Sequence, residues 1–469
     1  MISAALPSVA SGPPIGEGAA PLSVPPATFA KPVLYSIAGS NANSLVVTDV
    51  NGDGKLDVVA TNGVGVAVLL GNGDGTLQSA VTYNASATSL AVADMNGDGK
   101  PDVVVNGSNV GVFLGNGDGT FQPEIASNTG GIALAVADVN RDDHLDAVVT
   151  TSLGIAVLFG NGNGTFKPPV TTATVVSDAL AVADLNNDGK PDAVIILDSG
   201  DSGPHSRTDG TIGVLFGNGN GTFQSPVSYI TLGFYPQQII TADMNPDGVA
   251  DDILVVNRLG HVNAQEGSVE VLRNNGGGTF SGSLVRTDGR SDFAVAADDL
   301  NGDGMPDLAV VESYNISVVL AGGQFRHHGL FFPKKVAIAD LNGDDQPDLI
   351  ASSCLTLDLN CTSDGVIAVL LSTPAPTKTI LTTSGSPSHL NQMVTFTATI
   401  TSTRGPAPDG QTIAFFDGTK QIATATTIKS VASITTSSLA IGTHSIKAKF
   451  PGCPFFKRSV GVVQQIVNP

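Results

Sequence analysis

The sequence predicts an all-β protein, namely a seven-bladed β-propeller followed by a small immunoglobulin-like β-sandwich. Three observations predict this fold class. A nine-residue acidic loop recurs seven times, short apolar runs flank the copies, and helical periodicity is nearly absent. With 469 residues, the chain is long enough for one large and one small domain.

The acidic loops have the composition of a calcium site. They read DVNGDGKLD, DMNGDGKPD, DVNRDDHLD, DLNNDGKPD, DMNPDGVAD, DLNGDGMPD and DLNGDDQPD. Each has Asp at positions 1, 5 and 9 and Asn at position 3, so that alternating oxygen atoms can surround one hard cation, with the position 7 carbonyl as a further ligand. Because no helical pattern flanks the loops, they differ from EF-hands. The sequence therefore predicts up to seven Ca²⁺ sites on strand–loop–strand units.

The expected calcium ligands are the residues at positions 1, 3, 5, 7 and 9 of every loop. They are Asp49, Asn51, Asp53, Lys55, Asp57, Asp94, Asn96, Asp98, Lys100, Asp102, Asp138, Asn140, Asp142, His144, Asp146, Asp184, Asn186, Asp188, Lys190, Asp192, Asp243, Asn245, Asp247, Val249, Asp251, Asp299, Asn301, Asp303, Met305, Asp307, Asp340, Asn342, Asp344, Gln346 and Asp348. Asp143 and Asp345 replace the glycine at position 6, and Asp tolerates the left-handed backbone better than most residues, so we expect weakened sites there. Pro246 is expected to stiffen the fifth loop.

The spacing of the loops predicts how the units assemble. Their first aspartates are 45, 44, 46, 59, 56 and 41 residues apart, which is typical of four-stranded propeller blades. NGDG and NGNG turns predict β-hairpins, and a phosphate-binding glycine loop is disfavoured because no helix follows them. The last repeat lacks an outer strand, whereas residues 27–36 resemble the outer strand at 75–84. We therefore expect the N-terminal segment to complete the last blade and close the ring.

On these loops and the GNGDGTF-type hairpins, the sequence resembles the FG-GAP/VCBS repeat family, the calcium-bearing propellers related to the head of integrin α subunits. The resemblance covers about residues 27–372. It implies a binding protein that meets its ligand on the face away from calcium.

The rest of the chain divides into three segments. Residues 1–26 are rich in Ala, Pro, Ser and Gly and are expected to be disordered, and residues 373–378 form a Pro/Thr linker. Residues 379–469 contain alternating strands at roughly ten-residue spacing and resemble bacterial Ig-like repeats of cell-surface proteins. We expect this domain to act as a spacer or anchor.

Composition limits the classes of partner. The net charge is −20, and seven calcium ions would change it to −6, so most of the acidity belongs to the loops. No basic stripe suggests nucleic-acid binding, and no run of about 20 apolar residues suggests a membrane span. Sites of this open type need ~0.1–1 mM calcium, which predicts a secreted or cell-surface location, although no clear signal peptide begins the sequence.

Three cysteines bear on the same question of location. Cys354 and Cys361 flank a short excursion and are expected to form a disulfide, with two buried thiols as the alternative. Cys453 has no assigned role.

A candidate ligand-binding set is expected on the face opposite the calcium loops. Long polar insertions at 198–210 and 257–268 and connectors at 230–238, 286–293 and 326–335 are expected to lie there. The candidate ligand-binding residues are His205, Arg207, Tyr235, Arg258, His261, Arg290, His327 and His328, with Phe234, Arg286, Arg326, Lys334 and Lys335 nearby. A solvated rim without a ligand is the alternative. A transition-metal role for the His327–His328 pair and acid–base work by Asp288 and Asp292 are disfavoured.

The sequence favours a non-enzymatic, calcium-stabilised adhesion-type protein that recognises an unidentified extracellular protein or polysaccharide. The absence of Trp and the presence of only five Tyr weaken the carbohydrate case. A calcium-dependent polysaccharide lyase or hydrolase on the same scaffold is the alternative, because a fold does not settle function. We expect a monomer.

Overall fold

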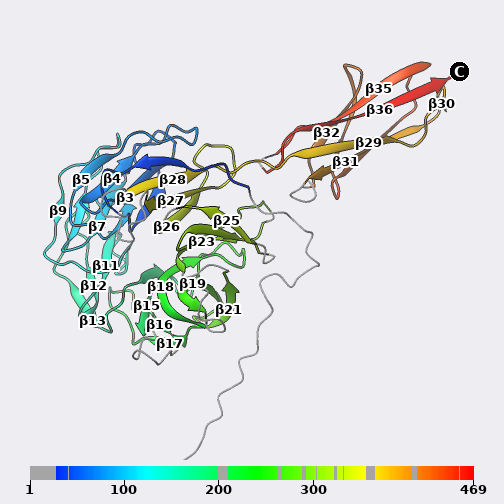
Figure 1. Ribbon diagram of the computed structural model, residues 1–469. Helices are drawn as coiled ribbons and strands as arrows, with labels where there is room; N and C mark the ends of the chain where they lie inside the picture. Colours follow the sequence, from blue (N-terminus) through cyan, green and yellow to red (C-terminus); the bar gives the residue numbers. More distant parts are fainter. Residues whose placement is uncertain are drawn as a thin grey trace, which may run out of the picture.

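The computed structural model describes residues 28–40, 42–198, 210–260, 267–287, 292–302, 304–321, 325–330, 332–354, 365–402, 409–453 and 455–469. These residues form β-strands and connecting segments and contain no helix, so the predicted all-β class is confirmed. It follows that no helix in this part of the chain is long and apolar enough to cross a membrane. Figure 1 shows sheets arranged around a ring, with a separate sandwich at the C-terminal end.

Seven sheets in the described residues each contain four antiparallel strands. The first two are β2 (Leu45–Thr48), β3 (Asp57–Thr61), β4 (Gly65–Leu69), β5 (Val81–Asn84) and β6 (Ser89–Ala93), β7 (Asp102–Asn106), β8 (Val110–Phe113), β9 (Ile125–Ala126). The next two are β10 (Leu134–Ala137), β11 (Asp146–Thr151), β12 (Gly154–Leu158), β13 (Val170–Ala173) and β14 (Leu180–Ala183), β15 (Asp192–Asp198), β16 (Thr211–Leu215), β17 (Val227–Ile230). The fifth and sixth are β18 (Gly233–Ala242), β19 (Asp252–Gly260), β20 (Ser268–Asn274), β21 (Phe280–Arg286) and β22 (Asp292–Asp298), β23 (Asp307–Glu312), β24 (Asn315–Val319), β25 (Phe325–Gly329). The last is β26 (Lys335–Ala339), β27 (Asp348–Cys354), β28 (Gly365–Leu370) and β1 (Val33–Ser36).

The pairing of β1 closes the ring. β1 runs antiparallel to β28, from Val33 opposite Val369 to Ser36 opposite Val366, so the N-terminal segment is the outer strand of the last sheet, as expected from the sequence. Backbone hydrogen bonds continue the contact beyond the strand, because Ala30 N donates to Leu371 O at 2.7 Å. An apolar cluster joins this sheet to the first, with Ile350 and Ile367 against residues of β3 and β4.

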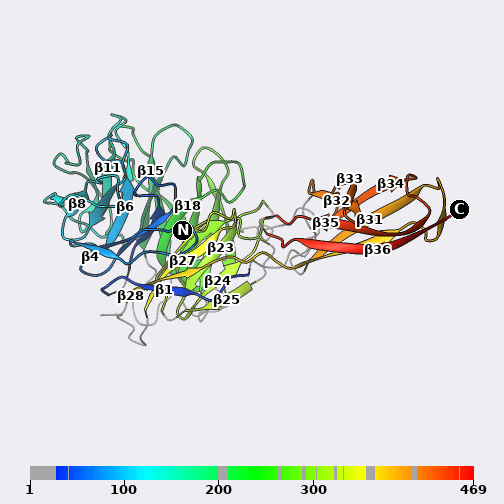
Figure 2. The same cartoon turned by 90° about the horizontal axis from the view of Figure 1, so that it is seen from above.

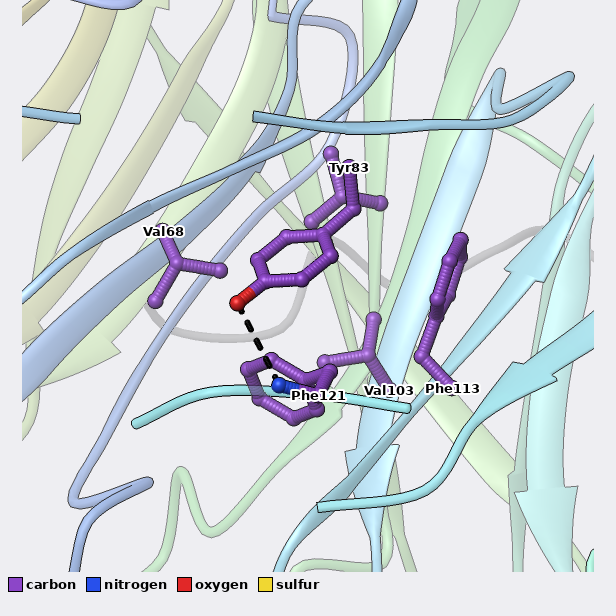
Figure 3. A pocket seen from close by; sticks show the side chains of 6 residues that line it. Val68, Tyr83, Val103, Phe113 and Phe121 are labelled. Atoms are coloured by element: carbon purple, nitrogen blue, oxygen red, sulfur yellow. Dashed lines mark hydrogen bonds between the residues drawn. The ribbon is translucent and has the colours of Figure 1, made fainter. Parts of the chain in front are cut away.

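Equivalent clusters lie between the other neighbouring sheets. The second and third strands are apolar runs buried on both sides, because each sheet is packed between two others. Figure 3 shows the contact between the first two sheets, where the Tyr83 ring lies near Phe113 and edge-on to Phe121, with centroids 5.9 and 5.5 Å away. Phe121 N donates to Tyr83 Oη at 3.2 Å. The apolar hollow in this figure is therefore part of the packing between sheets.

The C-terminal domain is a sandwich of two sheets. One contains β29 (Thr377–Thr383), β31 (Val394–Ser402) and β34 (Val431–Thr436), and the other contains β30 (Ser388–His389), β36 (Ser459–Asn468), β35 (Gly442–Phe450), β32 (Thr412–Asp417) and β33 (Lys420–Thr426). Phe396, Phe415 and Phe450 are fully buried between them. The predicted immunoglobulin-like domain is thus confirmed. Figure 2 shows that it extends from the side of the ring where β23 and β25 lie.

The linker is shorter than the predicted range 373–378. Thr377 and Lys378 already belong to β29, where they pair with Ser402 and Thr401. The sequence suggested a longer linker because of Pro374 and Pro376, which cannot donate backbone hydrogen bonds. The β-branched residues after Pro376 favour a strand at once.

Removal of residues 1–36 should destabilise the propeller far more than removal of residues 1–26, because only the longer truncation exposes the edge of β28. We expect the 1–36 truncation to lower the thermal midpoint by about 10 °C or more and to cause aggregation. Differential scanning calorimetry and light scattering would measure both effects. Identical melting of the two monomeric truncations would contradict the closing role of β1.

Candidate metal centres and the opposite face

The acidic loops join the first and second strands of each sheet and fold through their own side chains. In the first loop, Asp49 accepts hydrogen bonds from Gly52 N and Gly54 N at 2.7 and 2.8 Å. Asn51 Oδ1 accepts from Asp53 N, and Asp53 Oδ1 accepts from Lys55 N, both at 2.9 Å. The bond from the position 6 N–H to the first aspartate occurs in all seven loops. Asn and Asp side chains that bond forward along the backbone produce this tight turn.

The last aspartate of the loop is fully buried and has a different role. Asp57 Oδ2 accepts from Val50 N at 2.9 Å, and its Oδ1 accepts from Gly71 N, beyond the third strand, at 2.7 Å. The six other sheets repeat this pair of bonds. The carboxylate therefore ties the loop to the hairpin that follows the third strand.

The carboxylates of one loop also affect one another. Burial raises the pKa of Asp146 and Asp192 to about 6 and that of Asp348 to about 7. The other two aspartates of the same loop raise each of these pKa values further by repulsion. A bound cation would relieve this repulsion.

Two loops without glycine at position 6 adopt the expected backbone. Asp143 and Asp345 have φ angles of 65° and 59°, in the left-handed region. Pro246, at position 4 of the fifth loop, has a φ of 26°, far from the value of about −65° that its ring favours. Pro246 therefore adds backbone strain to the fifth loop, in addition to the expected stiffening.

The fifth loop also corrects the predicted position 9, which is held by Asp252 and not by Asp251. Asp252 opens β19 and accepts hydrogen bonds from Met244 N and Asn274 N at 2.8 and 2.7 Å. One extra residue precedes it, so Asp251 moves out of register. Asp251 is 9 % exposed, and its Oδ1 is buried without a hydrogen-bond partner. The consecutive aspartates in DGVADD were the only sequence signal of this ambiguity.

The loops offer the oxygen atoms that a hard cation prefers. Within the described residues no three acidic, His or Cys side chains stand ready to hold a metal ion, because the ninth carboxylate faces backbone amides. The half-buried carboxylate at position 1, the exposed carboxylate at position 5 and the amide oxygen at position 3 nevertheless suit calcium chemistry, and Asp251 adds a buried oxygen that lacks a donor. Asp303 of the sixth loop lies outside the described residues.

The structure describes only four of the eight candidate ligand-binding residues. His205, Arg207, His261 and Arg290 lie outside the described residues. Arg258 is exposed near the end of β19.

The other three are strand residues and not connector residues. Tyr235 lies in β18 beside a bulge, with a φ of 56°. His327 and His328 lie in the outer strand β25, and the His328 ring packs edge-on against Phe29 with centroids 5.1 Å apart. The sequence obscured β25 because residues 321–325, AGGQF, replace the usual NGDGTF hairpin.

Lys335 stands out among the remaining cations of this region. It begins the inner strand β26, four residues before Ala339, which pairs with the ninth aspartate of its loop. At about 3.3 Å per residue, Lys335 is ~13 Å from the loop end of the strand.

The residues at the position of Lys335 in the other inner strands are Ser44, Ser89, Ala133, Ala179, Gln238 and Ala294. Burial lowers the pKa of Lys335 to about 8, and no anionic group pairs with it in the described part of the chain. The neighbouring Lys334 Nζ lies 5.7 Å from the Phe293 ring centroid.

The cysteines are only partly described. Cys354 is disulfide-bonded, and Cys453 is a free thiol whose pKa is raised by burial. The expected partner, Cys361, lies outside the described residues.

Comparisons with known proteins agree with this architecture. The FG-GAP-like repeat matches residues 49–105, 94–149, 138–195, 251–310 and 299–351, and the bacterial Ig-like domain (group 3) matches residues 381–468. No curated protein matches the chain.

Three solved structures are similar to this chain at low identity, and the first of them reaches a TM-score above 0.5. BBS1N in complex with ARL6DN is 11 % identical, with a TM-score of 0.51 over 73 % of this chain and 96 % of that one. An Agrocybe aegerita lectin that recognises non-reducing terminal N-acetylglucosamine is 21 % identical, with a TM-score of 0.44 over 64 % and 90 %. The V. cholerae biofilm matrix protein Bap1 is 12 % identical, with a TM-score of 0.41 over 74 % and 91 %.

Replacement of Asp252 by Ala should destabilise the metal-free protein more than replacement of Asp251 by Ala. The first change leaves two buried N–H groups without an acceptor, at a cost of about 1–3 kcal/mol each, whereas Asp251 accepts only from the Asn274 side chain. Urea unfolding of the two variants would measure the difference. A larger loss for Asp251→Ala would restore Asp251 to position 9.

Proposed function

The chain belongs to the family of FG-GAP-like repeat proteins and ends in a bacterial Ig-like domain (group 3), and we propose that it is a calcium-stabilised extracellular binding protein. Both types of domain are typical of extracellular proteins. In this proposal the propeller binds a ligand without catalysis, and the C-terminal domain spaces or anchors it.

The acidic loops support the calcium part of the proposal. In five of the loops burial, and in addition repulsion from the other two aspartates of the loop, raises the pKa of the buried carboxylate. Where lysine occupies position 7, its ammonium group lies near the position 5 aspartate, at 3.3 Å in the first loop and 3.0 Å in the fourth. These exposed ion pairs are weak substitutes for a divalent ion. Calcium would neutralise the cluster and hold the loop on the sheet.

The main support for ligand binding on the face opposite the loops is the position of Lys335. It is the one charged residue among the seven equivalent inner-strand positions. At this position Ser44 and Gln238 bond to the next inner strand, through Leu90 N and Val295 N at 3.2 and 2.9 Å. Lysine cannot accept such a bond, and the described residues place no carboxylate beside its ammonium group. A largely buried cation in this situation favours an anionic ligand, such as one that carries a carboxylate.

Calcium should raise the thermal midpoint of the protein strongly. A free concentration of about 2 mM, tenfold above a dissociation constant of ~0.2 mM, contributes about 1.4 kcal/mol per occupied loop. Melting in chelator, in calcium and in the same concentration of magnesium measures the effect, and magnesium should be the weaker ion because it demands octahedral geometry. The variant Asp49→Asn/Asp53→Asn should bind one ion fewer by native mass spectrometry. Coincident melting curves in chelator and calcium would remove the basis for calcium stabilisation.

Lys335→Gln should weaken carboxylate binding about tenfold or more, whereas Lys420→Gln, an equal change of charge on the C-terminal domain, should leave it unchanged. Isothermal titration with oligogalacturonate and with a Glu-rich peptide, both in calcium, distinguishes a polysaccharide source of the carboxylate from a protein source. Equal affinities of wild type and Lys335→Gln, or no binding of either probe, would refute this ligand class without affecting the calcium result.

A further inference from the structure

The C-terminal domain is clamped to its own linker by the turn that joins β35 to β36. Ala375 N donates to Phe455 O at 3.0 Å, and Lys457 N donates to Ala375 O at 2.8 Å. Ala375 and Phe456 are 4 and 5 % exposed, so the linker residue belongs to the core of the sandwich. The two domains are therefore separated by very few free backbone bonds.

The same turn places an aromatic ring on the sixth acidic loop. A Cβ atom added to Gly302, at position 4 of that loop, would lie 2.3 Å from Cδ2 and 2.5 Å from Cε2 of Phe455. The ring therefore rests directly on the backbone of Gly302. In the first, second and seventh loops the equivalent glycines are free of such a neighbour, because a Cβ at Gly52, Gly97 or Gly343 would meet no atom within 4 Å.

Burial of the neighbouring residue agrees with this contact. Asn301, at position 3 of the sixth loop, is 2 % exposed, whereas Asn51 and Asn96 at the same position are half-buried. The ribbon views show the sandwich on the side of the ring where β23 and β25 of the sixth sheet lie (Figures 1 and 2).

The backbone that receives Phe455 is held by the first aspartate of the loop. Asp299 Oδ1 accepts from Gly302 N at 2.6 Å, and Asp299 Oδ2 accepts from Gly304 N at 2.7 Å. Gly302 has a φ of 80°, in the left-handed region, so its backbone faces the Phe455 ring only while the loop keeps its turn.

We propose that the sixth loop is the docking surface of the C-terminal domain, and that the packing of Phe455 on Gly302 fixes the angle between the two domains. A substitution that separates this ring from the loop backbone frees the C-terminal domain to adopt other angles.

The test compares two glycine variants of the full chain at the same loop position. Gly302→Ala and Gly52→Ala impose similar backbone strain, since the φ angles are 80° and 72°, but only the first adds a methyl group against Phe455. Small-angle X-ray scattering in calcium should show a broadened distribution of particle length for Gly302→Ala and Phe455→Ala. Gly52→Ala should scatter like wild type. Identical scattering by the two glycine variants, or an unchanged distribution for Phe455→Ala, would overturn the docking.

Discussion

The propeller depends on the buried carboxylate that ends each acidic loop. In the first sheet, Asp57 joins Val50 N of the loop to Gly71 N of the following hairpin, and the same bond pair recurs around the ring. Hydrogen bonds to a charged group contribute about 1.5–3 kcal/mol each, which offsets part of the cost of placing the carboxylate between packed sheets. The loop, the second and third strands and the hairpin thus form one unit, and whatever changes the charge of the loop also changes the sheet beneath it.

Neighbouring units pack together where a side chain of one sheet lies against a glycine in the hairpin of the next sheet. In the first hairpin, Gly75 leaves no room for a side chain because Leu371 of the last sheet occupies the space, and Gly119 faces Leu70 in the same way. The contact between Leu371 and Gly75 joins the end of the propeller to its beginning, as the β1–β28 pair does. The face that carries the acidic loops is therefore joined across the seam between the last and the first sheet, and the chain leaves for the C-terminal domain just after Leu371.

Repetition made most of this structure predictable. The loops, the sheets and the closing strand follow from residues that recur at fixed spacing, and Asp143 and Asp345 were assigned the correct backbone from the chemistry of Asp. Features that occur once were missed. Two adjacent aspartates concealed the register of the fifth loop, β25 lacks the usual hairpin signature, and the contact of Phe455 with Gly302 joins residues far apart in the sequence. The sequence likewise did not show that Lys335 occupies a position where the other inner strands have neutral residues, because only the strand register aligns these positions.

The geometry of the closing pair has a mechanical consequence. Val33 pairs with Val369, so the chain before β1 and the chain after β28 leave the ladder at the same end. Tension between them would first break the bonds that join Ala30 to Leu371 and Thr28 to Thr373, and then the strand pairs one after another. Such a pair unzips under a small force, whereas strands pulled from opposite ends resist in shear. A pull on the C-terminal domain against the N-terminal segment would therefore open the ring at its seam before it unfolded any other sheet.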